Sequence, residues 1–176
     1  MNVLSATDYS SLRHINELLY KSTSEDAIRL VQRDPSILED VRQYVASSFC
    51  FTEPGTQYHT GFRQQVKSWP INPVGQYVSE IAAMKRPLVV ADLGCGDAAI
   101  AKELVPRGFC VLSYDLKSDN HYIIQADICT KLPLPGSETR EHSGGQVVDI
   151  VVCALSLMST NWVGCIREAW RVLKSG

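Results

Sequence analysis

The residues best suited to chemistry are two closely spaced glycines and three acidic residues, each of which follows an apolar, strand-like run. Asp92 ends the first run, and Gly94 and Gly96 follow it, one residue apart. Glycines at this spacing let the backbone turn tightly and approach a ligand, and the helix that follows directs its N-terminus at that ligand. Asp115 and Asp127 follow the next two runs. Because open parallel sheets bind ligands at the carboxyl ends of their strands, this pattern predicts a nucleotide site.

The three acids would divide the recognition of a nucleoside among them. Asp115 is placed to accept hydrogen bonds from both ribose hydroxyls. Asp127 can accept one from an adenine amino group while Ile128 packs on the ring, and Asp92 can orient the turn or reach an amino-acid moiety through water. A dinucleotide also fits the GxGxxA pattern of 94–99, but it usually needs only the second acid, so S-adenosylmethionine is favoured. Taken singly, Asp92 and Asp127 are also compatible with merely capping turns.

The elements that must position these residues alternate between strands and helices. Strands are expected at 88–93, 110–114, 122–125 and 147–154, and helices at 98–105 and 161–173. Such alternation predicts an α/β fold with a parallel, Rossmann-like sheet. Residues 87–176 would form this cofactor-binding core, and residues 1–86 a helical lid or substrate region of the same folded unit. In such a fold a further central strand is expected after 161–173, and the sheet formed by this sequence is therefore expected to lack its C-terminal strands.

Two helices carry apolar residues at helical spacing, which predicts the faces that they turn inward. In the helix that starts at Asn72-Pro73, the inward residues are expected to be Val74, Tyr77, Val78 and Ile81. In the helix at 161–173 they are expected to be Cys165, Ile166, Ala169 and Val172.

The composition narrows the class of protein. The chain has 176 residues and a net charge of −2, which argues against binding nucleic acid by charge alone. No apolar run approaches the ~18 residues that span a membrane, and the N-terminus lacks the pattern of a secretory signal. The six cysteines form no CxxC pair, so no metal site is expected and a reduced, intracellular protein is favoured. Cys95, inside the glycine turn, is interpreted as a small filler because no base for a nucleophile is identifiable.

Three blocks of residues together resemble the ribosomal RNA-processing protein 8 family, also called nucleomethylin. They run from Tyr58 to Pro70, from Ala91 to Asp97 and from Leu155 to Asn161. The middle block is shared by methyltransferases in general, whereas the His-x-Gly-Phe and Leu-Ser-Leu-Met sequences of the outer blocks are specific. The resemblance extends from about residue 13 to the end of the sequence.

The resemblance implies a class I methyltransferase of the nucleus and nucleolus that uses S-adenosylmethionine. It would methylate N1 of an adenine in large-subunit ribosomal RNA during ribosome biogenesis. Its partners would be that RNA or a pre-ribosomal particle, with no membrane. Carried over residue by residue, the cofactor contacts would be His59, Gly94, Asp115, Asp127, Ile128 and Ala154, with Cys153 the next best match to Ala154. On the sequence alone, a lone histidine such as His59 is more typical of a surface or capping position.

The sequence identifies no catalytic residue. Residues 153–158, Cys-Ala-Leu-Ser-Leu-Met, stand where many amino-group methyltransferases carry an Asn/Asp-Pro-Pro-aromatic turn, which argues against exocyclic amine chemistry. Relative to the family, the 46–57 segment is longer than expected and the loop at 136–146 is inserted. The resemblance also leads us to expect further strands after 172–176 and a basic N-terminal extension, neither of which is in this sequence. Two other functions therefore remain open, namely a non-catalytic cofactor-binding or interaction module and a small-molecule methyltransferase.

Overall fold

The computed structural model describes residues 17–18, 20–33, 66, 69–85, 88–118, 120–139 and 145–175. The chain divides into two compact units, Met1–Asn72 and Pro73–Gly176. In the first unit, α2 (Ser24–Arg33) begins after Thr23, whose Oγ1 accepts a hydrogen bond from the N–H of Asp26. Of the region predicted as a helical lid, α2 thus belongs to the first unit and α5 (Pro73–Ala82) to the second.

The second unit is built on a four-stranded parallel sheet with the strand order β3-β2-β1-β4. The strands are β1 (Val89–Leu93), β2 (Cys110–Asp115), β3 (Ile123–Gln125) and β4 (Ile150–Val152). The last four residues of β1 are buried, as expected for a central strand that is covered on both faces. The predicted Rossmann-like α/β fold is confirmed.

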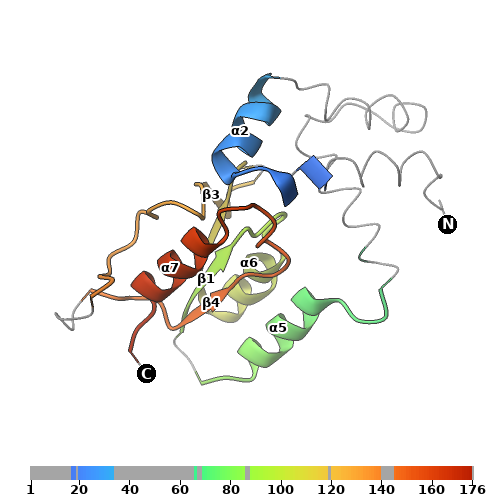
Figure 1. Cartoon of the computed structure of the whole chain (residues 1–176). Coiled ribbons are helices and arrows are strands. Elements are labelled where there is room, and N and C mark those ends of the chain that lie inside the picture. The colour runs from blue at the N-terminus through green and yellow to red at the C-terminus, as the bar shows by residue number, and fades with distance from the viewer. Residues whose placement is uncertain are drawn as a thin grey trace. The chain divides into compact units, whose positions relative to one another are not determined.

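Helices cover both faces of this sheet (Figure 1). Side chains of β1 alternate between the faces. One face packs against α7 (Val163–Val172), and its core contains Ala91, Leu93, Cys165, Ala169 and Val172. The other packs against α5 and α6 (Ala99–Leu104), and its core contains Val78, Ile81, Val90, Ile100 and Leu104. The result is a three-layer arrangement in which the carboxyl ends of the strands share one edge.

After α7 the chain returns to the sheet beside the start of the last strand. Leu173 forms a parallel bridge with Val148, and the N–H of Lys174 donates to the carbonyl of Val148. The side chain of Lys174 lies 2.6 Å from Oδ1 of Asp149. The other carboxylate oxygen of Asp149 accepts a hydrogen bond from the N–H of Val89, at 2.7 Å. One carboxylate therefore links the beginning of β1 to the segment that follows α7.

A second set of contacts, here called the α7 junction, ties α7 to the segment 132–136. Glu168 and Arg171 form a buried ion pair at 2.7 Å, with side chains only 8% and 5% exposed. Arg171 also donates to the carbonyls of Leu132, Leu134 and Gly136, and Glu168 accepts from the N–H of Leu132. Both charges are thus fully engaged, which is the condition under which burying an ion pair is tolerated.

Three local predictions were wrong. The last strand spans only Ile150–Val152 rather than 147–154, since Val148 before it bridges to Leu173 and Leu155 after it adopts a left-handed φ. Tyr77 is 38% exposed and Ile166 is 42% exposed, although both were expected to face inward. Helical spacing alone cannot separate the buried stripe of α7 from a second apolar row beside it, which contains Trp162, Val163, Ile166 and Trp170 and is exposed.

Candidate functional site

The predicted glycine turn lies at the carboxyl end of β1. The N–H groups of Gly94 and Cys95 both donate to the carbonyl of Tyr114, so the turn is fixed to the neighbouring strand β2. Gly94 has a φ of 77°, Gly96 of 55° and Ala98 of 57°, all in the left-handed region. Glycine adopts this region without steric cost, whereas Ala98 is a non-glycine residue held there at the start of α6. The sequence did not predict this strained alanine.

Asp115 joins the glycine turn directly. Its Oδ2 accepts a hydrogen bond of 2.8 Å from the N–H of Gly96. Its backbone carbonyl accepts another from the N–H of Ala126, so the ends of β2 and β3 are tied together as well. The carboxylate expected to bind ribose hydroxyls is therefore held at the turn, where the backbone leaves β1.

Asp92 is the buried acid of the site. It is 2% exposed, and burial, reinforced by the negative charge of Asp115, raises its pKa to about 7. Its register partner on β2 is Ser113, which is fully buried. Within the described part of the chain, the Ser113 hydroxyl has no hydrogen-bond partner. Buried polar groups of this kind are uncommon in a well-satisfied core and gather at functional sites.

Asp127 and Ile128 follow β3. Oδ1 of Asp127 accepts a hydrogen bond of 2.8 Å from the N–H of Cys129, so this acid does cap a turn, as the sequence left open. Ile128 is 8% exposed, and its Cδ1 lies 3.5 Å from the position that a Cβ on Gly94 would occupy. An apolar side chain therefore lies against the glycine turn, and the acid beside it has a local structural role.

The segment after β4 closes the other side of the turn. A Cβ on Gly94 would lie 2.3 Å from Cβ of Ser156, so only glycine fits there. Among the described residues, the buried hydroxyl of Ser156 has no hydrogen-bond partner. Leu155, between Ala154 and Ser156, is exposed and has a left-handed φ of 60°. Such backbone strain in a non-glycine residue is typical of functional segments. Ser156 was not predicted as a site residue, although it lies in the Leu-Ser-Leu-Met block that carried the resemblance.

Most of the predicted site residues thus lie on one edge of the sheet. Gly94, Gly96 and Asp115 meet at the turn, with Asp92 beneath them and Ile128 against it. Ala154 lies two residues beyond the end of β4, whose register with β1 pairs Val152 with Asp92. His59 lies outside the described residues, so its role stays a prediction.

Cys95 is not suited to nucleophilic attack. Burial raises the pKa of its thiol well above the usual range, and the charges of Asp115 and Asp92 raise it further. Since the thiolate is the reactive form, this cysteine is inert at neutral pH, which agrees with its interpretation as a small filler. Among the residues that the structure describes, no cluster of His, Cys, Asp and Glu could hold a metal ion, and no helix is long and apolar enough to cross a membrane.

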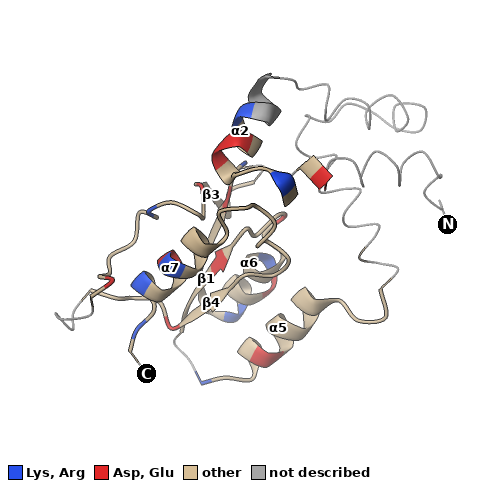
Figure 2. Ribbon diagram, viewed as in Figure 1, with Lys and Arg blue, Asp and Glu red and all other residues tan. Residues whose placement is uncertain are grey.

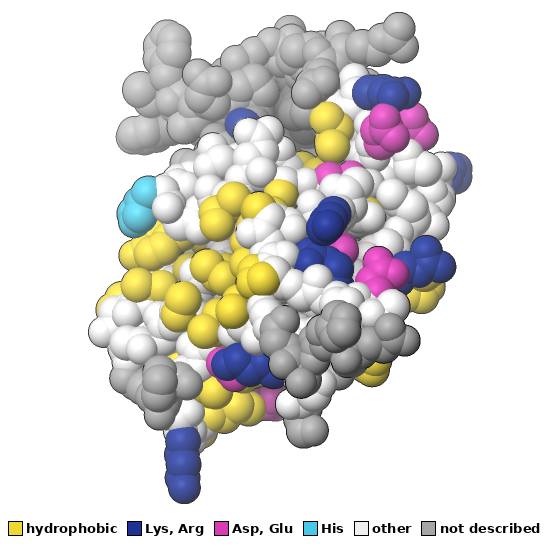
Figure 3. Space-filling view, turned by 90° about the vertical axis from the view of Figure 1, so that its left-hand side faces the viewer, with side chains coloured by type: hydrophobic (Ala, Val, Ile, Leu, Met, Phe, Trp, Pro, Cys, Tyr) yellow, Lys and Arg dark blue, Asp and Glu magenta, His cyan; other side chains and the backbone are white. Residues whose placement is uncertain are grey.

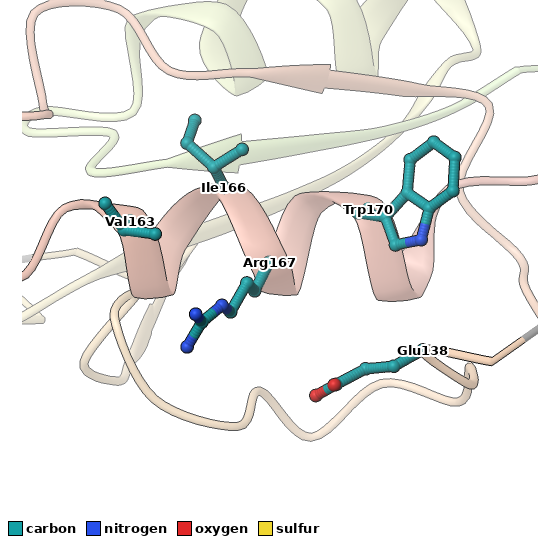
Figure 4. Close-up of a pocket in the computed structure, with 5 residues that line it drawn as sticks. All are labelled: Glu138, Val163, Ile166, Arg167 and Trp170. Carbon is teal, nitrogen blue, oxygen red and sulfur yellow. The ribbon is translucent and has the colours of Figure 1, made fainter.

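A separate cavity of about 370 Å³ lies beside α7 (Figure 4). It is lined by Val163, Ile166, Arg167 and Trp170 of α7 and by Glu138 of the preceding loop. None of the predicted site residues lines it.

Hydrophobic side chains also gather on one face of the molecule, beside charges of both signs (Figure 3). On α6, basic and acidic residues occur together (Figure 2), whereas the acid of α7, Glu168, is buried with Arg171.

Comparison with known proteins identifies the family. The family model described as "Hypothetical methyltransferase" matches residues 2–176. A 25S rRNA (adenine(645)-N(1))-methyltransferase of Schizosaccharomyces pombe is 34% identical over 96% of this chain and 48% of its own length. Proteins named ribosomal RNA-processing protein 8 from Dictyostelium discoideum and Arabidopsis thaliana are each 35% identical, over 95% and 92% of this chain and over 36% and 46% of their own lengths.

This chain therefore spans less than half the length of these curated relatives. The resemblance that the sequence blocks predicted is confirmed by the matches to ribosomal RNA-processing protein 8. A family of methyltransferases requires a methyl donor. By the extent of the match to its model, the chain belongs to this methyltransferase family.

Proposed function

We propose that the chain forms the cofactor-binding core of an S-adenosylmethionine-dependent enzyme that methylates N1 of an adenine in large-subunit ribosomal RNA. The observation that carries the proposal is the hydrogen bond between the Asp115 carboxylate and Gly96 at the end of β1 and β2. It holds an acid and a glycine-rich turn together where such sheets bind nucleosides. The activities for which the relatives are named support the choice of ribosomal RNA and of the N1 position.

The residues present fit adenosylmethionine. Gly94 lets the backbone of the turn pack closely against Ser156, and Ile128 offers an apolar surface beside it. The hydroxyl of Ser156, buried and without a hydrogen-bond partner among the described residues, is a polar group of the kind that a ligand would satisfy. In this proposal Asp115 holds the ribose, Asp127 and Ile128 hold the adenine, and Asp92 supports the turn beneath them. Ala154 and, from the resemblance, His59 are the remaining proposed cofactor contacts.

The chemistry asked of the protein is mainly positioning. When bound, adenosylmethionine supplies a methyl group activated by its sulfonium. The N1 atom of adenine has its own lone pair, so no strong general base is required for attack. Holding the two reactants in line can contribute about 7–11 kcal/mol. The target adenine must be unpaired or flipped out to expose N1. No side chain of the described residues is therefore assigned a proton-transfer role.

The site of action follows from the substrate. Large-subunit ribosomal RNA is made and processed in the nucleolus, so we propose that the protein acts in the nucleus and nucleolus, on free RNA or on a pre-ribosomal particle. Immunofluorescence of the tagged chain tests this, and exclusion from the nucleus would contradict it.

Calorimetric titration with S-adenosylmethionine tests the cofactor site. Asp115→Ala should abolish measurable binding, because both the ribose contact and the hydrogen bond to Gly96 are lost. The control is Glu103→Gln, which removes an exposed acid on α6 that pairs with Arg107, and it should bind like the wild type. Unchanged affinity in Asp115→Ala would show that the site has been placed wrongly.

Transfer of a labelled methyl group to large-subunit ribosomal RNA tests the reaction. Nucleoside analysis should give 1-methyladenosine, and primer extension should stop at the modified base, since N1 methylation blocks Watson–Crick pairing. An RNA with 1-deazaadenine at the mapped position should accept no methyl group. Cofactor binding without transfer to any RNA would favour a non-catalytic module. Transfer only to a small molecule would favour a small-molecule methyltransferase.

A further inference from the structure

Two cysteines that the proposed reaction does not use lie side by side behind the site. Cys153 follows β4 directly and is partly buried, whereas Cys165, in the first turn of α7, is fully buried. Their sulfur atoms are 3.8 Å apart, within hydrogen-bonding distance for thiols. Among the other described cysteines, Cys95 lies in the glycine turn and Cys110 is exposed on β2, whereas Cys129 packs against the same core as the pair.

The two thiols have different chemical character. The hydrogen bond between the two thiols lowers the pKa of Cys153, although burial and the charge of Asp92 act against it. The same hydrogen bond, together with burial, raises the pKa of Cys165 far above its usual range. Cys153 is thus the partly accessible sulfur that becomes a thiolate more readily, and Cys165 is a protonated thiol directly behind it. This is the arrangement of an attacking and a resolving cysteine.

The frame around the pair is rigid. A Cβ on Gly164, next to Cys165, would lie 2.3 Å from the carbonyl oxygen of Cys129, so α7 packs here as closely as a backbone allows. At its other end α7 is held by the α7 junction. The two sulfur atoms are thus held 3.8 Å apart by closely packed segments.

We propose that Cys153 and Cys165 form an oxidisable dithiol, a modification site at which a hydroperoxide links the two sulfur atoms as an intramolecular disulfide. In the first step the Cys153 thiolate attacks the terminal peroxide oxygen, the O–O bond breaks, and a sulfenic acid and hydroxide (or an alkoxide) form. In the second step the Cys165 sulfur, 3.8 Å away, bonds to the Cys153 sulfur as the S–O bond breaks, and the Cys165 proton passes to the departing oxygen, which leaves as water, so that no free Cys165 thiolate is required. Two thiols are oxidised and one hydroperoxide is reduced.

The link would join α7 to the segment that carries Ala154 and Ser156. The inference does not rest on the proposed function, because its readout is the state of the thiols.

The test treats the reduced full chain with hydrogen peroxide, alkylates remaining thiols with iodoacetamide in denaturant, and maps the peptides by mass spectrometry. We expect a peptide pair joined through Cys153 and Cys165, lighter by two hydrogen atoms and released by dithiothreitol. Cys165→Ala should leave a sulfenic acid on Cys153 that dimedone traps, and Cys153→Ala should leave Cys165 fully alkylated. Cys110→Ser is the matched control, since Cys110 is exposed on β2, and it should form the same link.

Two results would overturn the inference. One is complete alkylation of Cys153 and Cys165 in the wild type when Cys110 has already been oxidised. The other is a disulfide from either residue to Cys129, the neighbouring thiol of the same core. The wild-type peptide map decides between these outcomes even if a variant at the buried position 165 fails to fold.

Discussion

At the α7 junction every buried charge meets an opposite charge or a backbone dipole, whereas at the glycine turn the buried Asp92 faces a second acid. Burial acts to raise the pKa of Glu168, but the hydrogen bonds from Arg171 and from the N–H of Leu132 lower it overall. For Asp92, burial and the charge of Asp115 act in the same direction and raise the pKa. Glu168 is therefore a buried acid that stabilises the fold, whereas the ionised form of Asp92 destabilises it. Acids with raised pKa values of this kind are typical of functional sites.

The largest effect is expected from breaking the α7 junction. Arg171→Ala would leave the Glu168 carboxylate buried without its partner, which typically costs about 3–5 kcal/mol of unfolding free energy. Urea denaturation followed by circular dichroism measures the loss. The control is Arg107→Ala, whose partner Glu103 and own side chain are 60% and 47% exposed, and it should cost only about 0–1 kcal/mol. Equal losses in the two variants would contradict the comparison.

The next effect concerns pH and Asp92. Its pKa is about 7 in the folded protein and 3.8 in its ordinary state, so between these values the folded chain holds a proton that the unfolded chain has lost. Stability should therefore fall as pH rises from about 4 to about 7, by up to about 4 kcal/mol at about 1.4 kcal/mol per pKa unit. Asp92→Asn should remove this slope from urea denaturation curves measured between pH 4 and 8.

Asp149 provides a control in which the dependence of stability on pH has the opposite sign. The hydrogen bonds from Lys174 and from the N–H of Val89 lower its pKa. The contribution of Asp149 to the free energy of unfolding is therefore present above its ordinary pKa and is lost as pH falls through the lowered value. Asp149→Asn should weaken the chain at neutral pH and leave the Asp92 slope intact. A slope unchanged by Asp92→Asn would show that another group causes it.

A smaller effect is expected at the glycine turn. Gly94→Ala places a Cβ against Ser156 and a non-glycine residue at a φ of 77°, which should cost about 1–3 kcal/mol and weaken cofactor binding in calorimetry. Gly75→Ala, in α5, meets no atom within 4 Å and should instead stabilise the chain by about 0.5–1 kcal/mol. If Gly94→Ala behaved like Gly75→Ala, the close packing of the turn would be refuted.

The sequence predicted the parts of the fold whose pattern is local. The apolar run of β1, the acid and glycines after it, and the strand that ends at Asp115 all follow from the order of residues alone. The end of the last strand could not be predicted in this way, because residues 153–156 are apolar enough for a strand but turn over Gly94. That turn depends on a contact between segments distant in sequence.

The α7 junction was missed for a related reason. Glu168 and Arg171 are three residues apart on a helix, which usually indicates an exposed ion pair. Yet they fall at helical spacing between Cys165 and Val172, on the buried stripe, and this spacing was the available signal. What the sequence could not supply is the partner, the backbone of 132–136, which completes their hydrogen bonds.

The contact between Asp149 and Val89 has a consequence for the order of folding. It joins positions 60 residues apart, so β4 can be added to β1 only after a long loop has closed, whereas β1 and β2 follow one another through the short helix α6. We expect Asp149→Ala to accelerate unfolding with little change in the folding rate, giving a φ-value near zero in stopped-flow kinetics. A folding rate that fell with stability would place β4 in the nucleus instead. On the expected pathway, the side of the glycine turn formed by Ala154 and Ser156 is the last to be assembled.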